Sequence, residues 1–234
     1  MDRKLTDVDA VLFDLDGVLY VGDEVIEGAT RTLEQVRAAG LVCRFITNTS
    51  TRLPHSVGAK LRGMGFPIRD DEIFSVVTAT RDVLATRGCP SVHLLVGEEV
   101  RPFFSAFPES PEPECVVVGD IGAAWNYTLL NRVFNELMAG AELLAMHRNR
   151  YWQAGNGLRM DIGAFVSGLE YVSGKAATVV GKPSTAFFSL AVKSAGVPEG
   201  RVLMVVMTSR TTSGGRNGRA YVVCWCGPES SGPM

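Results

Sequence analysis

Residues 11–20 read Val-Leu-Phe-Asp-Leu-Asp-Gly-Val-Leu-Tyr, an apolar run that ends abruptly in two aspartates and a glycine. The apolar segment from Val8 to Phe13 predicts a buried strand of a parallel sheet. Asp14 and Asp16 then follow at the carboxyl end of that strand, which is where open α/β sheets bind ligands. Because neighbouring carboxylates repel one another, the pair predicts a cation partner, and Mg²⁺ prefers such oxygen ligands.

Predicted strands and helices alternate along most of the chain outside this stretch. A second strand is expected from Leu41 to Ile46, after a helix from Ala29 to Ala39. The segment from Tyr127 to Met138 has apolar side chains at helical spacing, which predicts an amphipathic helix. This alternation predicts an α/β fold with parallel sheets covered by helices.

Composition limits the class of protein. The chain has 234 residues, and 46% of them are hydrophobic. Its formal net charge is −2, so it has no excess of positive charge that would indicate binding to nucleic acid. No run approaches the roughly 20 apolar residues of a membrane span, and the first residues lead directly into a strand instead of a signal peptide. Cys43, Cys89 and Cys115 lie in or beside apolar segments and are expected to be small buried side chains. A reducing, cytoplasmic location is therefore expected.

The two aspartates suit phosphoryl-transfer chemistry. A carboxylate at the position of Asp14 can act as a nucleophile and form an aspartyl-phosphate. Asp16 can reach the same space, protonate a leaving oxygen and later activate water. Gly17 permits the tight turn that this arrangement needs. The ordinary alternative for an Asp-x-Asp sequence is a solvated turn.

Polar residues also follow two other predicted strands. Thr47 and Asn48 end the second strand and could bind phosphate oxygens, although these residue types also favour ordinary turns. Lys182 follows the apolar segment from Thr178 to Val180, where its charge could offset that of Asp14 and of a transferring phosphoryl group. The alternative for Lys182 is a surface lysine.

Together these elements resemble the haloacid dehalogenase (HAD) superfamily of Mg²⁺-dependent phosphotransferases. Residues 14–19 match its first motif, Thr47-Asn48 the second and Lys182 the third. The gap between the second and third motifs is long enough for a whole α/β domain, as in the C2-capped class IIA branch. Within that branch the chain resembles phospholysine phosphohistidine inorganic pyrophosphate phosphatase and the haloacid dehalogenase-like hydrolase domain-containing proteins.

The resemblance implies an organisation and a reaction. A Rossmann-like parallel-sheet core would comprise residues 1–78 and 179–206, with a C2-type cap at 79–178 and an atypical tail at 207–234. The substrate would be a small phosphorylated molecule, and a homodimer is a candidate assembly, since caps in this branch often pair subunits.

The resemblance also implies residue roles. Asp14 would be the nucleophile and Asp16 the acid and base, and Mg²⁺ would be held by Asp14, by the Asp16 backbone carbonyl and by an aspartate of a fourth motif. Substrate-choosing residues would lie around 147–152, from His147 to Trp152, and at Asp161. The alternative for these cap residues is plain surface and core.

The fourth motif is missing from its expected place. The strand predicted at Val202 to Val206 should be followed by Gly-Asp-Asp, but no aspartate occurs after Asp161. Codons for Met207 and Thr208 read in a shifted frame contain GAC, which encodes aspartate. We therefore hypothesise a reading-frame change at about Val206, which the coding DNA would decide. The expected consequences are weak Mg²⁺ binding, low activity and a sheet that lacks its next strand.

Other classes of function are compatible with the sequence. A non-catalytic binding protein that keeps the HAD fold is favoured by the loss of the fourth motif. A phospho-acceptor receiver domain would lack the long insertion between Thr47 and Lys182. A glycosyltransferase that uses Asp-x-Asp for a sugar nucleotide would not need Lys182.

Overall fold

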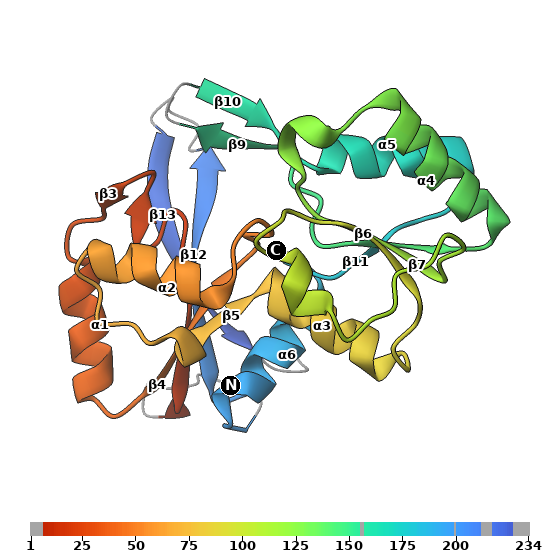
Figure 1. Ribbon diagram of the computed structural model, residues 1–234. Helices are drawn as coiled ribbons and strands as arrows, with labels where there is room; N and C mark the ends of the chain where they lie inside the picture. The colour runs from red at the N-terminus through yellow and green to blue at the C-terminus, as the bar shows by residue number, and fades with distance from the viewer. Residues whose placement is uncertain (1–6, 155–156, 199, 212–216, 227–234) are drawn as a thin grey trace. The chain divides into compact units, whose positions relative to one another are not determined.

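A computed structural model describes residues 7–154, 157–198, 200–211 and 217–226. The chain forms two compact units (Figure 1). Unit 1 comprises Met1–Thr47, Val57–Phe74 and Phe188–Met234, and unit 2 comprises Asn48–Ser56 and Ser75–Phe187. The core and cap boundaries expected from the sequence stay a prediction. Across the described residues, no helix has the length and apolar character needed to cross a membrane.

Unit 1 is built on a five-stranded sheet in the order β13-β12-β1-β4-β5. Strand β1 pairs in parallel with β4 on one side and with β12 on the other, as the buried apolar run predicts. A short antiparallel hairpin, β2 and β3, follows β1. The strands of this unit are β1 (Ala10–Asp14), β2 (Tyr20–Val21), β3 (Glu24–Val25), β4 (Val42–Thr47), β5 (Ile73–Ser75), β12 (Val202–Thr211) and β13 (Asn217–Cys226).

Helices cover both faces of this sheet. Alternate residues of a strand point to opposite faces, and Val11 and Phe13 of β1 share a buried cluster with Leu33 of α1 and Leu61 of α2. On the other face, Arg44 of β4 donates hydrogen bonds of 2.8 and 3.1 Å to a backbone carbonyl of α6. The helices are α1 (Ala29–Ala38), α2 (Pro54–Gly63), the 3₁₀ turn η2 (Asp70–Glu72) and α6 (Thr185–Ala195).

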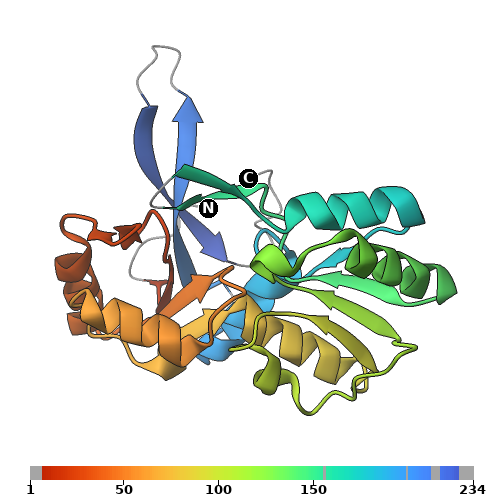
Figure 2. The same ribbon diagram turned by 45° about the horizontal axis from the view of Figure 1, so that its top comes forward.

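The C-terminal segment corrects one expectation. Strand β12 extends past the predicted Val206 to Thr211, and β13 pairs with it in antiparallel register along its whole length. Only Val202 to Val205 pair with β1, so the distal half of the β12–β13 ribbon continues beyond the sheet (Figure 2). The expectation that the sheet lacks a further strand is therefore wrong. The physical reason is that any extended segment can satisfy the backbone groups of an edge strand.

Unit 2 contains a four-stranded, fully parallel sheet in the order β11-β8-β7-β6. Helices α4 and α5 pack on one face around Val133, Leu137 and Val166, and α3 covers the other face, as both ribbon views show (Figures 1 and 2). The strands are β6 (Val92–Leu95), β7 (Cys115–Val118), β8 (Glu142–Ala145) and β11 (Thr178–Val179), with a separate hairpin of β9 (Tyr151–Ala154) and β10 (Gly157–Met160). The helices are α3 (Val76–Thr86), α4 (Tyr127–Ala139), α5 (Gly163–Ser173) and the 3₁₀ turns η3 (Arg101–Phe104) and η4 (Gly122–Ala124).

The local sequence explains why α4 begins and ends where it does. Asn126 caps its first turn by accepting a 3.0 Å hydrogen bond from the Leu129 N–H, and Gly140 ends it at a φ of 126°.

The cysteines follow the sequence expectation at two of three positions. Cys43 and Cys115 are buried, and burial raises the pKa of the Cys115 thiol to about 11. Cys89 is exposed, which corrects the expectation of a buried side chain. It lies in the turn after α3 at a φ of 58°, where the chain has already left the core.

Candidate active site

Asp14 and Asp16 lie where the first strand of unit 1 ends. Asp14 is the last residue of β1 and is half-buried, and its Oδ1 accepts a 2.8 Å hydrogen bond from the Leu15 N–H. Asp16 is exposed in the turn that follows. Gly17 adopts a φ of 79° and donates its N–H to the Tyr20 carbonyl at 2.8 Å, which closes the turn. The strand and turn therefore present both carboxylates at the carboxyl edge of the sheet.

Thr47 reaches the same edge from the neighbouring strand. Asp14 is level with Ile46 in the parallel register of β1 and β4, so Thr47 is one residue further along. The Thr47 side chain is buried. On the other side of β1, Phe13 is level with Val205, and the next residue of β12 is Val206. Strand β12 therefore brings no carboxylate to this edge.

Asn48 and Lys182 are brought together in unit 2, although 134 positions separate them. The Asn48 amide makes two hydrogen bonds to Lys182: Oδ1 accepts from the backbone N–H at 2.8 Å, and Nδ2 donates to the backbone carbonyl at 3.0 Å. The sequence predicted Asn48 as a phosphate ligand. In the structure its side chain binds the Lys182 backbone, so it fixes the loop that carries the lysine.

The loop that carries Lys182 has room only for glycine at position 181. A Cβ at Gly181 would meet Asn48 Oδ1 at 2.5 Å and the Met146 carbonyl oxygen at 2.6 Å. Real Cβ atoms do not approach so closely, so any larger residue would push the Asn48 and Lys182 loops apart.

Replacing Gly181 by alanine should lower the free energy of unfolding by about 1–3 kcal/mol, because the added Cβ displaces the Asn48 side chain and the Met146 backbone. Gly168 in α5 is the matched control, since a Cβ there meets nothing within 4 Å. The same change at Gly168 should stabilise by about 0.5–1 kcal/mol through helix propensity. Urea unfolding of both variants checks this, and equal effects would contradict the steric argument.

His147 and Asp161, expected among the substrate-choosing residues, are buried at 3% and 6% exposure in unit 2. The His147 Nε2 lies 3.2 Å from Ser50 Oγ and 3.9 Å from Asp161 Oδ1. Burial lowers the pKa of His147, because its effect outweighs that of the Asp161 and Asp120 carboxylates, which raise the pKa. Trp152 differs from these residues, because it lies on β9 and is 44% exposed.

Ser50 is a residue that the sequence analysis missed. A serine in a Thr-Asn-Thr-Ser turn has the composition of any loop, and only its buried contact with His147 distinguishes it. The signal is tertiary, because the two residues are 97 positions apart.

Known proteins resemble this chain along most of its length. A family model described as haloacid dehalogenase-like hydrolase matches residues 11–107. Haloacid dehalogenase-like hydrolase domain-containing protein 2 of Homo sapiens is 36% identical over 88% of this chain and 79% of its own length. Phospholysine phosphohistidine inorganic pyrophosphate phosphatase of Mus musculus is 35% identical over 87% of this chain and 77% of its own length.

Solved structures agree with these matches. The 4-nitrophenylphosphatase of Thermotoga maritima superposes with a TM-score of 0.79 at 25% identity, covering 86% of this chain and 78% of that one. These similarities confirm the predicted α/β fold with a HAD core. The chain belongs to the haloacid dehalogenase-like hydrolases.

Proposed function

We propose that this chain is a HAD phosphatase that hydrolyses a small phosphorylated substrate through an aspartyl-phosphate. The observation that carries the proposal is the placement of Asp14 and Asp16 at the carboxyl end of β1, beside the end of β4 at Thr47. Relatives named as phosphatases support it, including one named for phospholysine, phosphohistidine and inorganic pyrophosphate. Unit 2 would serve as the C2-type cap.

The proposed reaction has two steps. The Asp14 carboxylate attacks phosphorus while the bond to the leaving oxygen breaks and Asp16 gives that oxygen a proton. Water then attacks phosphorus, Asp16 takes its proton, and phosphate leaves to restore Asp14. The Lys182 ammonium and backbone N–H groups after Thr47 would stabilise the charge on the phosphoryl oxygens.

The residues present do not complete the magnesium site that the family pattern implies. No group of three or more His, Cys, Asp or Glu side chains in the described part of the chain could share a metal ion. Asp14 and Asp16 supply carboxylates, but β12 supplies none where the fourth motif should follow it. We therefore propose that Mg²⁺ binds weakly and that turnover is impaired.

The same observation favours a second candidate function. A HAD-like protein without the fourth-motif aspartate could bind a phosphorylated molecule without hydrolysing it. Asn48 holds the backbone of the Lys182 loop, and Thr47 ends β4, which supports a role for Thr47 and Lys182 in binding phosphate. The cytoplasmic location and the homodimer stay predictions.

Phosphate release from 4-nitrophenyl phosphate and inorganic pyrophosphate, measured over a Mg²⁺ titration, tests the proposed function. We expect slow hydrolysis that rises with Mg²⁺ well into the millimolar range. Binding of either compound with no hydrolysis at any Mg²⁺ concentration would favour the binding protein.

A further inference from the structure

The segment Asn48–Ser56 directly follows a strand of unit 1 yet belongs to unit 2. We call residues 48–56 the strap. Hydrogen bonds of Asn48, Ser50 and Leu53 explain this assignment, because they go to residues that lie shortly after strands of the parallel sheet of unit 2. The carboxyl edge of a parallel sheet gathers such loop residues from every strand.

The bonds follow the strand order of the sheet, β11-β8-β7-β6. Asn48 binds Lys182 after β11. Ser50 Oγ contacts His147 after β8 and accepts a 3.4 Å hydrogen bond from the Asp120 N–H after β7. The strap therefore crosses the edge one strand at a time.

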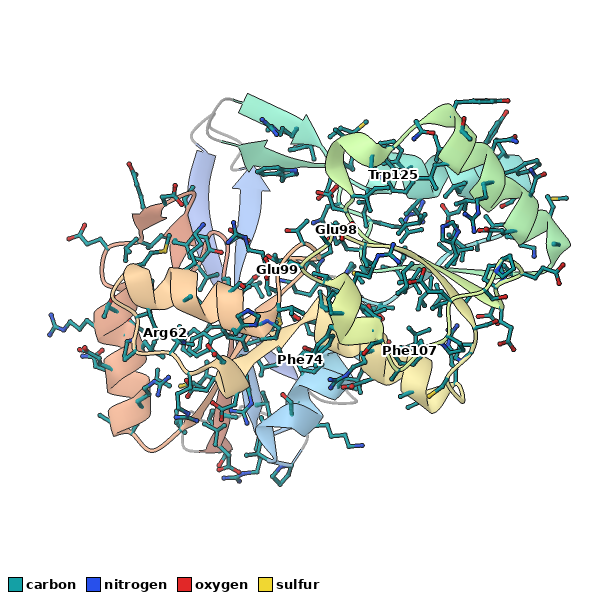
Figure 3. All side chains as sticks on the ribbon, in the orientation of Figure 1. Arg62, Phe74, Glu98, Glu99, Phe107 and Trp125 are labelled. Carbon is teal, nitrogen blue, oxygen red and sulfur yellow. The ribbon has the colours of Figure 1, made fainter. Side chains whose placement is uncertain are left out.

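The last bond of the strap is made by Glu99, after β6 (labelled in Figure 3). Its Oε1 accepts the Leu53 N–H at 3.0 Å. That hydrogen bond, together with one from the Ser56 side chain, lowers the pKa of the Glu99 carboxyl.

Ser50 is the most buried residue of the strap. Ser50 and His147 are each 3% exposed. The His147 Nδ1 accepts the Asn149 N–H at 3.4 Å, so its Nε2 carries the proton and donates to Ser50 Oγ. A buried polar pair of this kind is costly to disrupt, because each group left behind loses its partner without regaining water.

Ser50, His147 and Asp161 do not form a nucleophilic triad. In such a triad the carboxylate faces the ring nitrogen opposite the serine. Here Asp161 Oδ1 lies nearest Nε2, the nitrogen that serves Ser50, and it already accepts the Ile162 N–H at 2.7 Å. The geometry of the cluster therefore does not suit Ser50 as a nucleophile.

We propose that Ser50 and His147 are positioning residues that fix the strap, and through the Asn48 amide the backbone of Lys182, on the carboxyl edge of the unit 2 sheet. The expected effect on activity rests on the proposed function, because that function assigns Lys182 to the phosphoryl group. The geometry that supports it does not depend on that function: Asn48, Ser50 and Leu53 of one short segment are hydrogen-bonded to residues that follow neighbouring strands.

Backbone amide exchange in the full chain tests the proposal without any need for activity. The Lys182 N–H is bonded to Asn48 Oδ1, whereas the neighbouring Gly181 N–H is bonded to the Met146 carbonyl. In Ser50→Ala and His147→Leu, exchange at Lys182 should accelerate roughly tenfold, the net worth of one hydrogen bond, while Gly181 stays protected. Ser50→Thr and His147→Gln keep the oxygen and the N–H donor and should restore protection.

His93→Leu is the matched control. His93 is also a buried histidine of the unit 2 sheet, but it pairs with Glu136 at 2.7 Å and contributes no hydrogen bond to the strap. It should lower the melting temperature as His147→Leu does and leave Lys182 exchange unchanged. If His147→Leu does not fold, Ser50→Ala is sufficient to test the proposal, because it removes only one oxygen atom.

Two results would overturn the proposal: wild-type exchange at Lys182 in Ser50→Ala, or equal acceleration in His93→Leu. With 4-nitrophenyl phosphate, the strap variants should lower kcat roughly tenfold with little change in KM, because Lys182 is misplaced in the transition state. If the wild-type chain shows no turnover, the proposed function fails, and the exchange experiment still decides the positioning role.

Discussion

Replacing Asp14 by asparagine should reduce phosphate release by at least about a thousandfold, because the amide cannot attack phosphorus. The change is nearly isosteric, and the side-chain oxygen of the introduced asparagine can still accept the Leu15 N–H that Asp14 accepts. Stability should therefore change little. Steady-state hydrolysis of 4-nitrophenyl phosphate, with thermal unfolding alongside, measures both effects.

Asp23→Asn is the matched control for the lost charge. Asp23 is in the same unit, its side chain is 93% exposed, and it forms a 3.3 Å ion pair with Lys60 at the surface. This variant should hydrolyse at the wild-type rate. Equal rates for Asp14→Asn and Asp23→Asn would assign the nucleophile to another group. If the wild-type chain and both variants bind the ligand equally well and none hydrolyses it, the result would support the binding protein.

Introducing Gly-Asp-Asp at positions 206–208 should tighten Mg²⁺ binding at least roughly tenfold and raise turnover by about a hundredfold. Position 206 follows the Phe13–Val205 pair, so it is level with Asp14 on the adjacent parallel strand. Carboxylates added at this edge supply the ligands that Mg²⁺ prefers. A bound divalent ion stabilises the charge that develops on the phosphoryl group by roughly several kcal/mol. Titration calorimetry with Mg²⁺ and the phosphatase assay measure the two effects.

A version with Gly-Asn-Asn at the same positions separates charge from backbone effects. It makes the same glycine change and has side chains of the same size, but it lacks the negative charge that holds the metal ion. We expect it to behave like the unaltered chain. If the unaltered chain already matches the Gly-Asp-Asp version in turnover, the missing motif does not limit activity.

The local sequence was sufficient to predict β1 and the placement of its carboxylates. A continuous apolar run that ends in Asp-x-Asp-Gly favours a buried parallel strand with a tight exit turn, and β1 ends at Asp14, one residue past the predicted Phe13. The amphipathic helix expected from Tyr127 to Met138 is confirmed as α4, within a residue at its end. Both signals depend on neighbours in the chain.

The edge of the sheet in unit 1 could not be predicted in the same way. The segment 221–226 is apolar but isolated, and nothing in its composition names the strand that it joins. In the structure it forms part of β13 and pairs with β12. Edge pairing uses backbone groups that every residue carries, so the sequence contains little information about it.

The sequence by itself determined the family, the parallel sheets and the residues at the strand ends, because those features follow from local patterns. Only the tertiary structure decided what Asn48 and Ser50 bind. Asn48 holds the backbone of Lys182, 134 positions away, and Ser50 contacts His147 at a separation of 97. Such contacts depend on how the strand ends of a folded sheet are ordered in space, and a periodic pattern along the chain does not encode that order.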